Sequence, residues 1–398
     1  MELQNSPGRR KIPEKWRWKI AKCPGANYIS RTGRISAREV GTGMAATIKD
    51  RMMCNMAIYA GPGRAAPELI KLLQAQEGLA GGHFTGIATL HEGKIHLAKV
   101  CGDCRRLLES TDAMELPGSI GIAHSRTPGI ALDSWAQPFL ASDGMNVYCA
   151  NGIGPADVLP DKRAFLQEMA DRLRREGMSF ATGVAEKLPS YIRLDDNLTY
   201  HDSELAGAVI GYFNRSMPLA EAMTRFFAAR PAQLTALAMS VREPDRVLAF
   251  RYNQSLFYGR KDGAYCAATS GTALQDLGFP WIAPVPPATV SSVRADRIEF
   301  VPMEAYSDKL TVAPDLGAVW KFLDGCFADG KEHCVIELCD ELPRHPELDA
   351  PGMVAQDSFA VYSYLMEKLR RGELLRSSRM VPASRPGTMR SETVFRRA

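Results

Sequence analysis

The chain has 398 residues, of which 45% are hydrophobic and 24% are charged, a composition typical of a globular protein with two or three domains. Its 33 glycines, 25 prolines and 9 cysteines exclude a collagen-like repeat, disorder along the whole chain and a small disulfide scaffold. No run of 18 apolar residues occurs, and the N-terminal segment has no apolar signal sequence. We therefore expect a cytoplasmic protein with reduced thiols and no membrane contact.

The net charge of +4 is distributed unevenly along the chain. Residues 1–53 carry a net charge of +8 and residues 370–398 one of +6, which leaves −10 for the residues between them. The acidic middle is expected to be the globular body. The basic ends are either solvated tails or contacts for an anionic partner such as nucleic acid.

The elements predicted in chain order are mixed α and β. Residues 1–53 lack sustained periodicity and are expected to be a basic leader or propeptide. The next part, 54–303, is predicted to be one domain in which short strands alternate with helices. Strands are expected at 55–60, 85–90, 94–100, 120–124, 147–150, 234–241, 247–251, 265–268, 290–293 and 297–300, and helices at 66–76, 163–176, 204–213 and 220–227.

A different pattern follows in residues 304–398, which are expected to form a helical domain with a basic tail. Helices are predicted at 316–323, 335–341 and 358–371, followed by an arginine-rich segment with a Pro/Gly turn. Three helices followed by a basic hairpin resemble a winged helix. An appendage for oligomerisation would show the same pattern, so both interpretations stay open.

Cys54 opens an apolar strand, and Arg126 directly follows a second one. Asn151-Gly152 closes a third apolar strand 97 residues after Cys54, and Asp202 precedes a predicted helix. These segments resemble those of class II glutamine amidotransferases, which are N-terminal nucleophile hydrolases. In that family an N-terminal cysteine starts the first strand, an HTR-type segment supplies an arginine, and an Asn-Gly pair follows a strand.

The resemblance extends to three further segments in the order of the family. Residues 81–88 stand in place of an RGYDSAG-type stretch, 136–139 in place of NAHPH, and 201–204 in place of SDTE. Together the six segments cover about residues 54–302. The resemblance implies a four-layer αββα sandwich that acts on glutamine without a cofactor or a metal.

The resemblance also implies a role for each of these residues. The Cys54 thiol would attack the side-chain amide carbon of glutamine, its own α-amino group would accept the proton, and water would release glutamate from a thioester. The Asn151 amide and the Gly152 N–H would stabilise the oxyanion. Arg126 would bind the α-carboxylate of glutamine as a two-pronged donor, and Asp202 would bind the α-ammonium group.

Each of these residues also has an ordinary structural interpretation: a core thiol for Cys54, a surface ion pair for Arg126, a turn for Asn151-Gly152, and the N-cap of a helix beginning at the next residue for Asp202. The chain also departs from the family pattern at Asn55, which replaces a glycine, at Ala150, which replaces a histidine, and at 127–129, which replace a longer WATHG-type stretch. Three consequences of the short loop remain possible: an uncovered pocket, a different amide substrate or a loss of glutaminase activity.

An α-amino group can act as the base only if Cys54 is the first residue of the mature chain. Three explanations for residues 1–53 therefore remain: they are cleaved, translation begins at Met52 or Met53, or they persist and the protein is inactive.

The partner of the domain is also open, because the sequence contains no recognisable ammonia-using synthase motif. One hypothesis is an enzyme subunit, either alone or in a homo-oligomer, that passes ammonia to a separate synthase subunit. The other is a non-catalytic regulator whose pocket senses an amide or amino acid and whose C-terminal domain binds DNA or protein.

Overall fold

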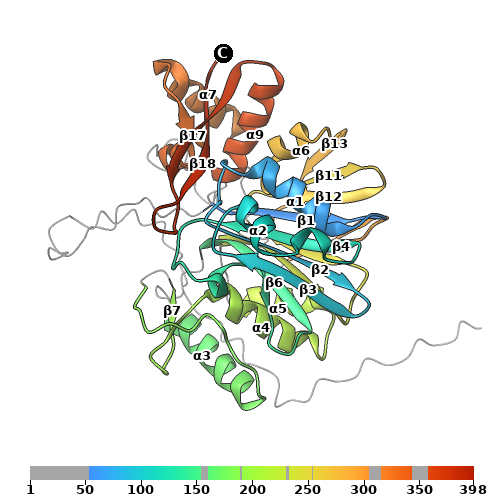
Figure 1. Cartoon of the computed structure of the whole chain (residues 1–398). Coiled ribbons are helices and arrows are strands. Elements are labelled where there is room, and N and C mark those ends of the chain that lie inside the picture. Colours follow the sequence, from blue (N-terminus) through green and yellow to red (C-terminus); the bar gives the residue numbers. More distant parts are fainter. Residues whose placement is uncertain are drawn as a thin grey trace, which may run out of the picture. The chain divides into compact units, whose positions relative to one another are not determined.

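Two antiparallel β-sheets with helices on their outer faces form the body of the protein (Figure 1). The computed structural model describes residues 53–153, 160–188, 191–229, 233–252, 254–303, 315–342 and 357–398. The leader expected at 1–53 lies outside these residues, apart from Met53. None of the helices in this part of the chain is both long and apolar enough to span a membrane.

The first sheet has seven strands in the order β13-β11-β12-β1-β4-β2-β3. Their bounds are β1 (Asn55–Ala60), β2 (Phe84–His91), β3 (Lys94–Val100), β4 (Ile120–Arg126), β11 (Phe257–Lys261), β12 (Ala264–Ala268) and β13 (Trp281–Pro284). Strands β1 and β4 are neighbours in which Asn55 lies opposite Ser125. This register brings Cys54, which precedes β1, to the same end of the sheet as Arg126, which ends β4.

The second sheet has six strands in the order β15-β14-β10-β9-β6-β5. Their bounds are β5 (Phe139–Leu140), β6 (Asn146–Ile153), β9 (Gln233–Ser240), β10 (Val247–Arg251), β14 (Thr289–Val293) and β15 (Ile298–Pro302). Alternate side chains of the two sheets share one apolar core, in which Met56 and Ile58 of β1 lie with Val147 and Cys149 of β6. Because successive side chains of a strand point to opposite faces, the other residues of these strands meet helices.

Helices α1 (Ala65–Gln76), α2 (Cys104–Ser110) and α6 (Gly271–Asp276) pack their apolar residues on the first sheet. Helices α3 (Pro160–Arg175), α4 (Asp202–Asn214) and α5 (Leu219–Ala229) pack theirs on the second. Short elements complete the body: η2 (Ala113–Glu115), η3 (Asp133–Trp135), β7 (Ile192–Arg193) and β8 (Thr199–Tyr200). The predicted mixture of helices and antiparallel sheets is confirmed, in the layer order helix, sheet, sheet, helix.

The C-terminal part combines helices with a small three-stranded sheet in the order β16-β18-β17. Its elements are α7 (Leu316–Cys326), η5 (Phe327–Asp329), β16 (His333–Cys334), α8 (Val335–Glu341), α9 (Asp357–Arg370), β17 (Leu374–Pro382) and β18 (Met389–Arg397). The arginine-rich segment is thus the long hairpin β17–β18. The sequence of helices and strands agrees with the resemblance to a winged helix, which stays a prediction.

Helix α9 packs on the body of the protein through its N-terminal turn. Phe359 stacks on Phe257 of the first sheet with ring centroids 5.7 Å apart. The hydroxyl of Ser358 accepts a hydrogen bond of 3.1 Å from the N–H of Ser255. The apolar face of α9 is therefore used inside the molecule, whereas binding of the C-terminal part to nucleic acid stays a prediction.

Candidate active site

Cys54 is buried at the start of β1, with only 6% of its surface exposed. Its N–H donates a hydrogen bond of 2.9 Å to Oδ1 of Asn151, and its carbonyl accepts one of 3.2 Å from the Thr269 hydroxyl. The thiol Sγ lies 3.9 Å from Oγ1 of Thr127. The structure therefore brings Cys54 and Asn151 together at the mouth of the sheet pair, although they belong to different sheets.

The carboxamide of Asn151 has two unlike ends. Its oxygen accepts the Cys54 N–H, whereas its Nδ2 is buried and has no hydrogen-bond partner among the described residues. The next residue, Gly152, has a φ of 139°, a positive value that favours glycine. A buried donor without a partner costs about 1–3 kcal/mol, so an oxygen of a bound ligand would compensate for it. The structural interpretation as a simple turn is wrong, because both residues lie within β6.

Burial raises the pKa of the Cys54 thiol above its usual value. The Thr127 backbone, the charge of Arg126 and the Thr127 hydroxyl act in the opposite direction but do not offset the burial. The thiol is therefore protonated at neutral pH. It needs a base before it can act as a nucleophile.

Arg126 is buried, with 2% exposure, in a box of aromatic rings. Its guanidinium donates to the Trp135 carbonyl over 3.2 Å and to the Tyr191 hydroxyl, and it lies 5.0 Å from the centre of the Phe84 ring. No carboxylate in the described part of the chain pairs with this cation. The interpretation of Arg126 as a surface ion pair is therefore wrong, and the site offers an anion a buried, uncompensated positive charge.

A short loop covers the guanidinium of Arg126. A Cβ added at Gly129 would lie 2.7 Å from Nη2 of Arg126, so a larger residue at this position would require the buried guanidinium to shift. The short 127–129 segment thus packs directly on the arginine. Whether the short loop leaves the glutamine pocket uncovered stays a prediction.

Asp202 begins α4, and its Oδ1 accepts a hydrogen bond of 3.1 Å from the N–H of Ile192. The helix starts at Asp202 itself and is capped by His201, whose Nδ1 accepts from the N–H of Ser203. The alternative that Asp202 is the N-cap is therefore wrong by one residue.

Tyr191 links Asp202 to the rest of the site. Burial raises the pKa of the Tyr191 phenol, and the charges of Arg126, Cys54 and Asp202 all act on it. The first of these lowers the pKa, whereas the other two raise it. Three of the five residues that were singled out from the sequence therefore act on the pKa of this phenol, and one of them, Arg126, donates a hydrogen bond to it.

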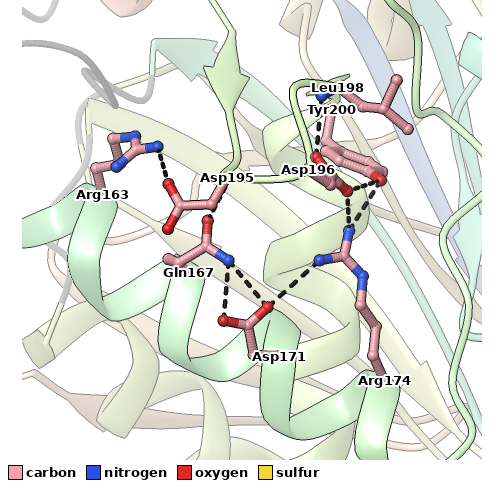
Figure 2. A network of polar contacts seen from close by, with 8 residues as sticks. All are labelled: Arg163, Gln167, Asp171, Arg174, Asp195, Asp196, Leu198 and Tyr200. Atoms are coloured by element: carbon pink, nitrogen blue, oxygen red, sulfur yellow. Dashed lines mark hydrogen bonds and ion pairs between the residues drawn. The ribbon is translucent and has the colours of Figure 1, made fainter.

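A polar network fixes the turn that precedes Asp202 (Figure 2). Arg174 of α3 donates to Asp196 over 2.5 Å and to the Tyr200 hydroxyl over 2.8 Å, and Arg163 donates to Asp195 over 2.6 Å. The acceptors all belong to the β7–β8 hairpin. Helix α3 therefore holds the hairpin whose second strand leads into Asp202.

Several residues of the site were not singled out from the sequence. Thr269 of the loop after β12 donates to the Cys54 carbonyl and accepts from the N–H of Met56 over 2.9 Å. Gln137 pairs with both backbone groups of Ala150, at 2.8 Å to its N–H and 3.1 Å to its carbonyl. This pairing holds the residue before Asn151 where the family pattern has a histidine. Only the position of Gln137 in the NAHPH-like segment could have indicated that this residue belongs to the site.

No family model matches the chain. Among curated proteins, the glutamine–fructose-6-phosphate aminotransferase of Pyrococcus horikoshii is 39% identical over 103 residues, which is 25% of this chain and 17% of that protein. The enzyme of the same name from Caldanaerobacter subterraneus subsp. tengcongensis is 23% identical over 312 residues, covering 77% of this chain and 45% of that protein. The chain thus spans less than half the length of these relatives.

Solved structures of low sequence identity are also similar to the chain. Glutamine phosphoribosylpyrophosphate amidotransferase from B. subtilis gives a TM-score of 0.49 at 14% identity, over 81% of this chain and 66% of that one. A glutamine aminotransferase class-II domain protein from Silicibacter pomeroyi gives 0.40 at 14% identity, over 63% and 99% of the two chains.

The sequence relatives, the paired antiparallel sheets and the order of the segments around Cys54 agree with one another. The body of this chain has the fold of a class II glutamine amidotransferase, of the N-terminal nucleophile hydrolase type.

Proposed function

We propose that the chain is a glutaminase, which hydrolyses glutamine to glutamate and ammonia with Cys54 as the nucleophile. One observation carries this proposal: Asn151 binds the Cys54 nitrogen through Oδ1 and leaves its buried Nδ2 without a partner. The same carboxamide therefore binds the backbone of the nucleophilic residue and offers a donor for the oxyanion.

The reaction follows from these positions. The Cys54 sulfur attacks the side-chain amide carbon, and the carbonyl oxygen becomes an oxyanion that Nδ2 of Asn151 and the N–H of Gly152 stabilise. The nitrogen leaves as ammonia after it receives a proton, which gives a thioester. Water then attacks the same carbon, the sulfur leaves as a thiol, and glutamate is released.

The base in this proposal is the α-amino group of Cys54. The thiol is held protonated by burial, and an α-amine of pKa about 8 can accept its proton at neutral pH. While Met53 is attached, the Cys54 nitrogen is an amide and cannot accept a proton. The proposed activity therefore requires that the bond between Met53 and Cys54 be broken.

Glutamine would be bound through its two charged α-groups. The buried guanidinium of Arg126 uses two of its five N–H groups on Trp135 and Tyr191, so the others can receive a carboxylate. Asp202 would take the α-ammonium group. The Tyr191 hydroxyl already accepts a hydrogen bond from Arg126, so we expect Tyr191 to shift or to share the guanidinium with the carboxylate when glutamine binds.

Ammonia would pass to a separate synthase subunit, since the sequence contains no recognisable ammonia-using synthase motif. A homo-oligomer is part of the same proposal.

A regulatory function is the second candidate, and the burial of Met53 favours it. Met53 is 4% exposed, and its Sδ lies 3.7 Å from Sγ of Cys339 in α8. If the leader persists, this packing holds Cys54 as an inactive internal residue whose pocket would bind glutamine without hydrolysing it.

The two candidates differ in the fate of glutamine. We expect the mature protein to release glutamate, and we expect Cys54→Ala, or alkylation by a glutamine-mimicking electrophile, to abolish the release. Cys149→Ala is the matched control, because Cys149 is equally buried but lies in the core between the sheets. Glutamine binding without glutamate release in the mature protein would instead support the regulator.

A further inference from the structure

Residues 77–83, which we call the bridging loop, connect α1 to β2 and lie between the C-terminal hairpin and the site. On one side the loop touches both strands that carry the site. The Asn55 amide donates to the Ala80 carbonyl over 2.5 Å, and the N–H of His83 donates to the Arg126 carbonyl over 3.0 Å. The N–H of Gly82 donates to the Ser125 hydroxyl over 2.8 Å. The loop is therefore bonded to the residue after Cys54 and to Arg126 itself.

The other side of the bridging loop touches the hairpin β17–β18. The N–H of Thr393 donates to the Gly78 carbonyl over 2.8 Å. Gly78 has a φ of +90°, and a Cβ at this position would lie 2.6 Å from Oγ1 of Thr393. The two backbones approach so closely that only glycine fits between them.

His83 makes the second contact with the hairpin. The N–H of Ser384 donates to Nδ1 of His83 over 2.9 Å, and the Ser384 hydroxyl lies 2.8 Å from the same atom. A backbone N–H can only donate, so Nδ1 is the acceptor and the neutral ring carries its proton on Nε2. Burial, together with the charges of Arg390 and Arg126, lowers the pKa of His83 to about 3. The ring is therefore neutral, and the contact persists across the physiological pH range.

The hairpin also closes a space next to the loop. A cavity of about 140 Å³ is lined by Gly82 and His83 on one side and by residues of the hairpin tip, including Arg385 and Met389, on the other. The tip is thus a wall of this cavity, and its displacement would expose the bridging loop to water.

We propose that the hairpin β17–β18 is a positioning element of the glutamine site, which fixes the bridging loop through His83 and thereby the strand end that carries Arg126. His83 is a positioning residue in this proposal, because it contacts the loop and the hairpin and not the substrate. The kinetic part of the inference rests on the proposed glutaminase function, whereas the structural part does not.

The test uses His83 variants of the full chain. Asparagine can present an acceptor where Nδ1 stands, whereas alanine has none and the longer side chain of glutamine places its oxygen elsewhere. We expect His83→Ala and His83→Gln to raise amide hydrogen exchange of residues 77–83 by roughly fivefold, the effect of losing one hydrogen bond. We expect His83→Asn to restore the exchange of the wild type.

His91→Ala is the matched control, because His91 lies exposed in the β2–β3 hairpin and contacts neither the loop nor β17–β18. Ser384→Ala is the milder variant, since it removes only the hydroxyl from the hairpin side. In glutamine hydrolysis, His83→Ala should raise KM several-fold and change kcat less, because the loop is bonded to Arg126 and not to the thiol.

The outcomes separate the two proposals. Unchanged exchange in His83→Ala, or equal exchange in the Asn and Gln variants, would overturn the inference. If all variants, including the wild type, fail to release glutamate but the exchange pattern appears, the glutaminase proposal fails and the positioning of the loop by the hairpin stands.

Discussion

At the scale of single residues, the two ends of the Asn151 carboxamide differ. Its Oδ1 accepts a hydrogen bond from the Cys54 nitrogen, whereas its buried Nδ2 has no acceptor among the described residues. Asn151→Asp keeps an oxygen for the Cys54 N–H but replaces the donor with a second oxygen. We expect kcat for glutamine hydrolysis to fall about 10²–10³-fold with a smaller change in KM, the loss typical of one oxyanion donor. A kcat within threefold of the wild type in steady-state kinetics would remove Asn151 from the oxyanion site.

Arg126 is expected to act in binding and not in bond breaking. An ammonium group is a point charge and cannot present two parallel N–H groups to a carboxylate, so Arg126→Lys should raise the KM for glutamine strongly, by about tenfold or more. The buried aromatic box makes a folding control necessary, and circular dichroism of the variant supplies it. An unchanged KM would mean that the role of Arg126 is structural.

The raised pKa of the Cys54 thiol gives a pH dependence with a defined sign. Only the thiolate reacts with iodoacetamide, so in the chain that keeps Met53 attached, and thus has no α-amino base at Cys54, the rate of alkylation at Cys54 should stay low at pH 8 and rise as the pH increases beyond 9. Thr127→Val removes one of the groups that lower this pKa and should slow alkylation further at each pH. Mass spectrometry of the Cys54 peptide measures both rates, and full reaction at pH 7 would contradict the burial argument.

The site could be found from the sequence only in part. Cys54, Arg126, Asn151 and Asp202 are recognisable because each stands in a short segment whose order along the chain resembles a family. Thr269 could not be found, since it reaches Cys54 only through the pairing of β1 with β12, 215 residues along the chain. Tyr191 stands outside the segments on which the resemblance rests, so nothing in the sequence distinguished it.

At the scale of elements, the periodicity of the sequence predicted long elements better than short ones. The strand expected at 94–100 is β3 with the same bounds, and the helix expected at 66–76 is α1 with one further residue. Helices α2 and α6, of seven and six residues, were not predicted, although α8, which also has seven residues, was predicted at 335–341 with the same bounds. The amphipathic face of α9 was recognised, but its partner is the first sheet, which local sequence cannot reveal.

Phe359 is expected to fasten the C-terminal part to the body. Its ring stacks on Phe257 and lies 4.8 Å from the guanidinium carbon of Arg251. Phe359→Ala removes both contacts and should lower the free energy of unfolding by about 3 kcal/mol, near the lower end for a packed phenylalanine. Urea unfolding measures this change.

Leu375→Ala is the control for that variant, since Leu375 on β17 is 44% exposed. We expect it to change the free energy of unfolding by less than about 0.5 kcal/mol. Equal effects of the two substitutions would show that α9 is not docked through Phe359.

At the scale of the whole molecule, three buried histidines make stability dependent on pH. Burial lowers the pKa of His83 and His124 to about 3 and that of His201 well below its usual value. These rings stay neutral in the folded protein but take up a proton in the unfolded chain below a pH of about 6.5. The contribution of these histidines to the free energy of unfolding is therefore fully present above pH 6.5. It is lost as the pH falls toward 3, by up to about 1.4 kcal/mol per pH unit for each ring.

Urea unfolding at pH 7, 6 and 5 measures this slope. His83→Asn keeps an acceptor for Ser384 but has no titrating group. The slope of its unfolding free energy below pH 6 should therefore be shallower than that of the wild type by the contribution of one histidine, up to about 1.4 kcal/mol per pH unit. The same free energy of unfolding at pH 7 and pH 5 would contradict the neutral burial of these histidines.

In the proposed mechanism, Cys54 becomes a nucleophile only when it is the first residue of the chain. The direct measurement replaces residues 1–53 with a removable tag whose cleavage exposes Cys54, and it follows intact mass and glutamate release in the same sample. We expect no glutamate before cleavage and sustained release once the mass shows a chain that begins at Cys54. Equal release before and after cleavage, or none after complete cleavage, would contradict the account.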